Sequence, residues 1–151
     1  MTAPDMTGYL ADEEIGRLRM GYDRGVMLAA SQGSVGDTSP AAALVGFLGT
    51  AVYDADAMAP ADRERCILAL LATRPHALTL GVHVYWGLAE GLSLRDIYQV
   101  LVLAAGYAGV DAFAVPAFLL RGRILPLLKG LAAEGAPSTP QVLQALIGAL
   151  A

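Results

Sequence analysis

Three polar side chains share one face of an otherwise apolar stretch of the sequence. His76, Thr79 and His83 include both histidines of the chain, and the positions around them are almost all apolar. Spaced i, i+3 and i+7, they fall within roughly 60° of one another on an α-helix. Solvent-facing stripes usually carry Lys, Glu or Arg, so two imidazoles here favour an acid–base site in a pocket. A plain solvent-facing stripe is the alternative.

A carboxylate lies on the apolar side of the preceding segment. Glu64, Ile67, Leu68 and Leu71 have the i, i+3, i+4 and i+7 spacing of one helix face. A carboxylate that faces a core has to find a partner or give up its charge. The alternative is that Glu64, one turn from the helix start, reaches water.

Metal binding by the two histidines is not favoured. His76 and His83 are seven positions apart, which separates their Cα atoms by roughly 10.5 Å along a helix axis, whereas helical metal chelates typically use i and i+4. A metal-dependent enzyme using both histidines with Glu64 remains open as a third reading.

Four further side chains are candidates for substrate binding. Arg74, beside the start of the histidine segment, could pair with a carboxylate, or it could cap the carbonyls of the helix before it. Tyr85, Trp86 and Tyr107 could form an apolar wall for a lactone, an aromatic ring or a polyketide-like molecule. Packing in the core or at an interface is the alternative for these aromatic residues.

The elements that must position these residues are all helical, because the apolar residues recur with helical spacing and no stretch alternates like a strand. Ser39–Pro40, the Arg74–Pro75 break and the Ser93–Asp96 capping box mark helix ends. Asp111 is expected to be an N-cap, and the last long helix is expected to kink at Pro116 and to be interrupted near Pro126. The predicted helices cover about residues 12–30, 40–53, 60–73, 76–90, 94–108, 111–133 and a short segment from 139, within one domain of residues 1–151.

The composition indicates apolar surface that one small domain cannot hide. Hydrophobic residues make up 56% of the chain and charged residues 16%, against about 25% charged in typical soluble domains. Residues 97–120 are apolar enough to test for a membrane span, but a central Asp111 would cost roughly 2.5–3.5 kcal/mol there, and a turn near Gly109 divides the segment. Burial between subunits of a homo-oligomer is therefore favoured over a membrane.

Charge and cysteine content exclude other classes of function. The net charge is −4 and basic residues do not cluster, which argues against nucleic acid as a partner. Cys66 is the only cysteine, so no intrachain disulfide can form and a reducing cytoplasm is the expected compartment. Residues 1–9 show no signal-peptide pattern.

The spacing of these residues resembles a known superfamily. Proteins similar to alkylhydroperoxidase D carry Glu, eleven residues, Cys-x-x-Cys, three residues and then His. Counting from Glu64 places the cysteine positions at His76 and Thr79 and the final histidine at His83. The segments 59–64, 83–93 and 107–110 are also similar. The chain thus resembles the carboxymuconolactone decarboxylase/alkylhydroperoxidase D-like superfamily over about residues 40–130, with residues 1–38 and 134–151 outside.

The resemblance implies a bundle of six to seven helices, assembled as a trimer or hexamer and working without a cofactor. Because both cysteines are missing, it does not imply a thiol peroxidase. It implies a decarboxylase-like lyase, with isomerase, cyclase and hydrolase outcomes open, that acts on a small or mid-sized carboxylate, lactone or polyketide-like substrate. Ala77, Leu78 and Leu103 depart from the decarboxylase pattern, so the substrate is open.

The resemblance and the residue chemistry together assign roles. His83 is expected to be the general acid/base, His76 a second acid/base or oxyanion partner, and Glu64 the group that orients one of them. Arg74 would hold an anionic group, with Thr79 beside the histidines. The alternative function is a non-catalytic oligomeric binding or assembly protein that retains the fold.

Overall fold

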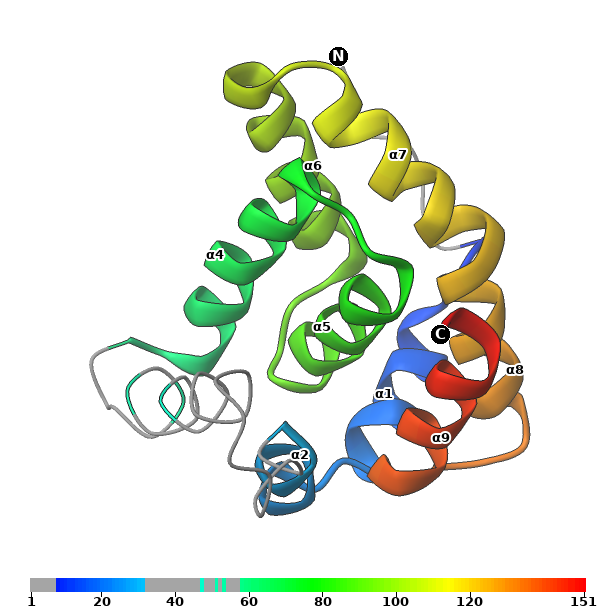
Figure 1. Cartoon of the computed structure of the whole chain (residues 1–151). Helices are drawn as coiled ribbons and strands as arrows, with labels where there is room; N and C mark the ends of the chain where they lie inside the picture. Colours follow the sequence, from blue (N-terminus) through cyan, green and yellow to red (C-terminus); the bar gives the residue numbers. More distant parts are fainter. Residues whose placement is uncertain (1–7, 32–46, 48–50, 52, 54–57) are drawn as a thin grey trace.

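The computed structural model describes residues 8–31, 47, 51, 53 and 58–151, and every regular element in this part of the chain is a helix (Figure 1). The all-α prediction is confirmed for these residues. The helix predicted over 40–53 lies outside them apart from Phe47, Ala51 and Tyr53. The helices are α1 (Asp12–Met20), α2 (Arg24–Ser31), α4 (Pro60–Thr73), α5 (Ala77–Ala89), α6 (Leu94–Ala108), α7 (Asp111–Leu119), the π-helix η2 (Leu120–Ile124), α8 (Leu125–Ala133) and α9 (Thr139–Leu150).

Helix α5 forms the centre of the fold. It contacts α1, α4, α6, α7 and α9, and Figure 1 shows α4 and α6 on one side of it and α1 and α9 on the other. Its buried side chains include Leu80, Val84, Tyr85, Trp86 and Leu88. A helix that is apolar on nearly all sides is typical of a position surrounded by other helices.

Local end signals place α4, α5 and α6 where the sequence predicts them. Pro60 lies in the first turn of α4, and Arg74 ends that helix with a non-helical backbone before Pro75. His76 is the N-cap residue of α5. At the start of α6, Ser93 Oγ accepts a hydrogen bond from the Asp96 backbone N–H at 3.1 Å, and Asp96 accepts one from Ser93 N at 2.9 Å. The Ser93 hydroxyl also donates to the Asp96 carboxylate at 2.6 Å, and this bond, together with the one from Ser93 N, lowers the pKa of Asp96.

The prediction of one helix over residues 12–30 is wrong. The structure divides this segment into α1 and α2 at Gly21, because the chain there contacts the start of α9. Thr139 N donates to Gly21 O at 3.2 Å, and Asp23 N donates to Thr139 Oγ1 at 2.7 Å. A Cβ on Gly21 would lie 1.9 Å from the Pro137 carbonyl oxygen. Contacts 116 residues apart therefore override the local helical pattern.

The long helix predicted over 111–133 is one continuous helical path with a π-helix between α7 and α8. The predicted interruption lies at Leu120–Ile124, just before Pro126, and Pro116 is inside α7. A proline ring clashes with the carbonyl four residues earlier in a regular α-helix, and a wider turn ahead of Pro126 relieves that clash. The prediction of Asp111 as N-cap is wrong, because Val110 is the N-cap and Asp111 is the first helical residue.

The segment tested for a membrane span is two helices. Gly109, at φ 99°, ends α6, and α7 begins at Asp111. Among the helices described, none has both the length and the apolar character needed to cross a bilayer.

Candidate functional site

Helix α4 turns Glu64 into the interior. Its side chain is 0% exposed, and Leu68 and Ala72 continue the same buried stripe. The core-facing interpretation of Glu64 therefore holds, and the alternative of contact with water does not. Arg63, its neighbour in sequence, is also buried at 3% exposure.

Glu64 and His83 form a pair between α4 and α5. Glu64 Oε2 lies 2.9 Å from His83 Nδ1, and the His83 side chain keeps 12% of its exposure. The carboxylate accepts the Nδ1 proton, which orients the ring and leaves Nε2 with a free lone pair when the imidazole is neutral. Nε2 makes no hydrogen bond with the described residues. This arrangement can take up and return a proton at Nε2.

Two aromatic rings stack beside the pair. The Trp86 ring lies nearly parallel to the His83 ring, with centroids 5.7 Å apart, and to the Tyr53 ring, with centroids 4.6 Å apart. Trp86 Nε1 donates to Glu90 Oε1 at 3.4 Å. Burial, with a smaller contribution from the negative charge of Glu64, raises the pKa of Tyr53 to about 12. Tyr53 is therefore a neutral phenol at physiological pH.

Arg63 completes the charged group on the other side of Glu64. Its Nε lies 3.7 Å from Glu64 Oε1, its Nη1 donates to the Tyr53 carbonyl oxygen at 3.4 Å, and its Cζ lies 4.9 Å from the Tyr53 ring centroid. Arg63 Nε, Arg63 Nη2 and Glu64 Oε1 are buried without a hydrogen-bond partner among the residues that the structure describes. The two side chains balance in charge but leave hydrogen-bonding capacity unused.

Sequence reasoning gave Arg63 and Tyr53 no role. Helical periodicity places Arg63 about 100° from Glu64 and so away from the apolar stripe. The available signal was its position directly beside a core-facing carboxylate, in a chain where charged residues are scarce.

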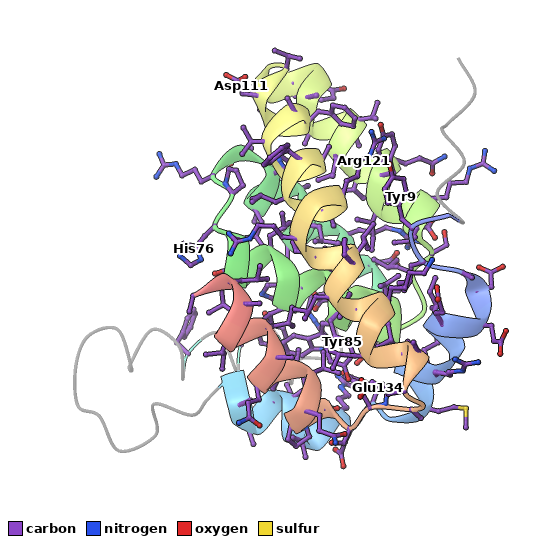
Figure 2. All side chains as sticks on the ribbon, turned by 90° about the vertical axis from the view of Figure 1, so that its right-hand side faces the viewer. Tyr9, His76, Tyr85, Asp111, Arg121 and Glu134 are labelled. Carbon is purple, nitrogen blue, oxygen red and sulfur yellow. The ribbon has the colours of Figure 1, made fainter. Side chains whose placement is uncertain are left out.

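The other members of the histidine stripe lie at the surface. His76 and Thr79 are both exposed, with His76 Nδ1 3.4 Å from Thr79 Oγ1. Figure 2 shows His76 at the edge of the molecule, directed away from the helices. The stripe therefore runs from solvent at the start of α5 to the interior at His83, and the structure does not bring His76 or Thr79 into contact with the pair.

The remaining predicted site residues are spread over the chain. Arg74 is exposed, and its backbone N–H donates to Leu71 O at the end of α4. Tyr85 lies among the helices (Figure 2) and is fully buried. Its hydroxyl lies 3.2 Å from Thr139 Oγ1. Tyr107 is 90% exposed on α6. Of the aromatic wall predicted from the sequence, Trp86 alone contacts the Glu64–His83 pair.

Trp86 also lines an apolar pocket of about 190 Å³. The pocket is formed by α2, α5 and α9, and its other lining residues are Met27, Ala30, Leu78, Val82, Leu143 and Ile147. On α5, Val82 directly precedes His83. An apolar pocket thus adjoins the segment that carries the candidate base.

No group of three or more metal-ligating side chains gathers anywhere in the described part of the chain. No protein-family model, curated protein or solved structure matches this chain. The superfamily resemblance consequently stays a prediction from the motif spacing.

Proposed function

We propose that this protein is a cofactor-free acid–base enzyme of the carboxymuconolactone decarboxylase-like type, with a decarboxylase-like lyase reaction as the leading outcome. The observation that supports this proposal is the Glu64–His83 pair, with 2.9 Å between Oε2 and Nδ1, in which the carboxylate is fully buried and the imidazole keeps slight exposure. Buried pairs of this kind are typical of sites that transfer protons.

In the proposed mechanism, His83 Nε2 takes a proton from the substrate or from water and returns it later in the reaction. Glu64 is a positioning residue that holds the ring and stabilises the imidazolium when it forms. Proton transfer by a positioned side chain typically contributes about 10²–10⁴-fold to a rate. Isomerase, cyclase and hydrolase reactions use the same proton transfers.

The apolar pocket beside Trp86 supports a substrate with an apolar body. A volume of about 190 Å³ lined by aliphatic side chains suits a ring or a short chain, as in a small lactone or a polyketide-like molecule. In this proposal the reacting group of the substrate points from the pocket toward His83.

We also propose that the protein is a cytoplasmic homo-oligomer, a trimer or hexamer. Leu103 and Tyr107 on α6, Val110 at the N-cap of α7 and Phe118 on α7 are each more than 60% exposed. Large side chains of this kind gain stability when a second subunit covers them.

A non-catalytic binding or assembly protein is the second candidate. The observation that favours it is the exposure of His76, Thr79 and Arg74, since three of the residues expected at an active site lie apart from the Glu64–His83 pair.

The decisive experiment follows lactones, keto acids and small carboxylic acids by NMR for loss of CO2, ring opening or exchange of protons adjacent to a carbonyl. We expect turnover by the wild type, a 10²–10⁴-fold loss in His83→Gln, and wild-type rates in Glu134→Gln, which changes an exposed carboxylate. Turnover that persists unchanged in folded His83→Gln would refute the acid–base role. Absence of turnover by an oligomeric wild type would favour the assembly protein.

A further inference from the structure

One edge of the Arg63 guanidinium is buried and unused. In arginine, Nε–H and Nη2–H point the same way and form a fork that holds one or two acceptor oxygens. Both atoms are buried and make no hydrogen bond to any described residue. The guanidinium is fixed by the contact of Nη1 with the Tyr53 carbonyl and by the Tyr53 ring below it. The fork is therefore held in place without an occupant among the described residues.

An unused acceptor lies beside the fork. Glu64 Oε1 is 3.7 Å from Arg63 Nε and makes no hydrogen bond within the described part of the chain, while Oε2 of the same carboxylate contacts His83. Buried polar atoms without partners are rare in native proteins. Two donors and one acceptor left open side by side indicate a place for a bound polar group.

The charges of the group select the kind of ligand. Arg63 and Glu64 cancel, so the group is neutral when His83 is neutral. A carboxylate on the fork would add an uncompensated negative charge in a buried place, with its oxygens next to Glu64 Oε1. A neutral carbonyl oxygen can accept hydrogen bonds from the fork without changing the net charge of Arg63, Glu64 and His83. Moving a proton from such a ligand to His83 also keeps the sum at zero, since the enolate and the imidazolium cancel.

We infer that the Nε/Nη2 edge of Arg63 binds the carbonyl oxygen of a neutral, enolisable substrate and that Arg63 is a catalytic residue that stabilises its enolate. The inference rests on the acid–base chemistry of the proposed function, and it narrows the substrate class to ketones, lactones and other neutral carbonyl compounds. Among the proposed reactions it therefore favours the isomerase and cyclase outcomes over loss of CO2, which needs a carboxylate on the substrate. Of Arg63, Glu64 and His83, the last keeps the most solvent contact, so the ligand reaches the fork from the side of the imidazole.

The chemical step is a proton transfer. The bond between the carbon next to the carbonyl and its hydrogen breaks, and the proton goes to Nε2 of His83. The electron pair of that bond forms the carbon–carbon double bond, and the carbonyl π pair moves onto the oxygen held by Arg63. Return of the proton reverses the step, so no oxidant, reductant or further reactant is needed.

The test uses acetophenone and δ-valerolactone as neutral probes and benzoate as an anionic one. Exchange of protons next to the carbonyl is followed by NMR in D2O, and binding is followed by the emission of Trp86, the only tryptophan of the chain. Arg63→Lys keeps the charge but removes the fork, and we expect it to slow exchange of the neutral probes by about 10²–10³-fold. Arg95→Lys, an exposed arginine on α6, is the control and should exchange at the wild-type rate.

The possible failures are distinguishable. Exchange that is lost in His83→Gln but unchanged in Arg63→Lys overturns the role of Arg63 and leaves the proposed function intact. Binding of benzoate that disappears in Arg63→Lys overturns the neutral ligand and makes the fork a carboxylate site. Absence of exchange by the wild type overturns this inference together with the proposed chemistry on carbonyl compounds.

A measurement on the wild type covers the case in which Arg63→Lys does not fold. The Nε–H signal of Arg63 in a ¹⁵N-labelled sample should shift when acetophenone is added, because a carbonyl oxygen then accepts from it. An Arg63 signal that stays in place at saturating probe overturns the inference.

Discussion

At the scale of single residues, the Glu64 carboxylate is fully buried, so water does not solvate it. Glu64 is stabilised by His83 at one oxygen and by Arg63, at 3.7 Å, near the other. Each partner is itself largely buried. The free energy of unfolding therefore depends on all three side chains together, since removing one charge leaves another uncompensated.

Glu64→Gln should show this dependence directly. The substitution keeps the shape of the side chain but leaves the Arg63 charge buried without its counter-ion, and we expect it to lower the free energy of unfolding by about 3–5 kcal/mol. Urea denaturation monitored by circular dichroism measures the change. Glu134→Gln, at an exposed position, should stay within about 0.5 kcal/mol of wild type. Equal stability of the two variants would contradict the coupling of Glu64 to Arg63.

Sequence reasoning could find Glu64 and His83 because both follow from helical spacing. It could not find Arg63, because the burial of that side chain depends on Tyr53, which belongs to a different segment of the chain. The same limit applies to His76 and Thr79. They lie on the same helix face as His83. The spacing does not show that this face is exposed near the start of α5 and buried only at His83.

At the scale of elements, ends with a local chemical cause were predicted well and ends with a tertiary cause were not. Pro60, the Arg74–Pro75 break and the Ser93 capping box fix α4 and α6 from within the sequence. The break at Gly21 is fixed by backbone contacts with the segment before α9. Asp23, which accepts a hydrogen bond from Val26 N at 3.0 Å at the start of α2, was the local signal for it, and helical periodicity does not register such a residue. Helical periodicity depends only on residues that are close together in the sequence, so it cannot indicate a contact between distant segments.

Two glycines near this break should respond in opposite ways to alanine. Gly21→Ala places a methyl group against the Pro137 backbone, and we expect a loss of about 1–3 kcal/mol in the free energy of unfolding. Gly16, inside α1, has no atom within 4 Å of an added Cβ, so Gly16→Ala should gain roughly 0.5–1 kcal/mol from helix propensity. Thermal denaturation of both variants measures the difference, and a stabilised Gly21→Ala would contradict the close approach to Pro137.

At the scale of the whole molecule, the apolar composition is only partly explained by the core. The core buries many large side chains completely, yet Leu103, Tyr107 and Phe118 remain exposed on α6 and α7. The sequence predicted the all-α fold because its helical periodicity is continuous. Periodicity did not indicate which apolar faces would stay uncovered, because that depends on how the helices pack together.

If subunits cover these side chains, a charge placed there should separate them. We expect Leu103→Glu to shift the protein toward monomer in light scattering after size-exclusion chromatography, because an interface core excludes an unpaired carboxylate. Ala133→Glu, at an exposed position at the end of α8, should elute like the wild type. A wild type that is monomeric at every concentration would contradict the proposed assembly.

The π-helix between α7 and α8 bears on how the length of this segment can change. A π-turn holds one residue more than an α-turn, and Gly122 within it is exposed, with no atom within 4 Å of an added Cβ. Excising Gly122 would close this turn to an ordinary α-turn and leave Pro116 and Leu128 on the sides that they now bury. It would also return the Pro126 ring to its clash with the carbonyl four residues earlier. Homologous chains that are one residue shorter at this point should therefore carry another residue in place of Pro126.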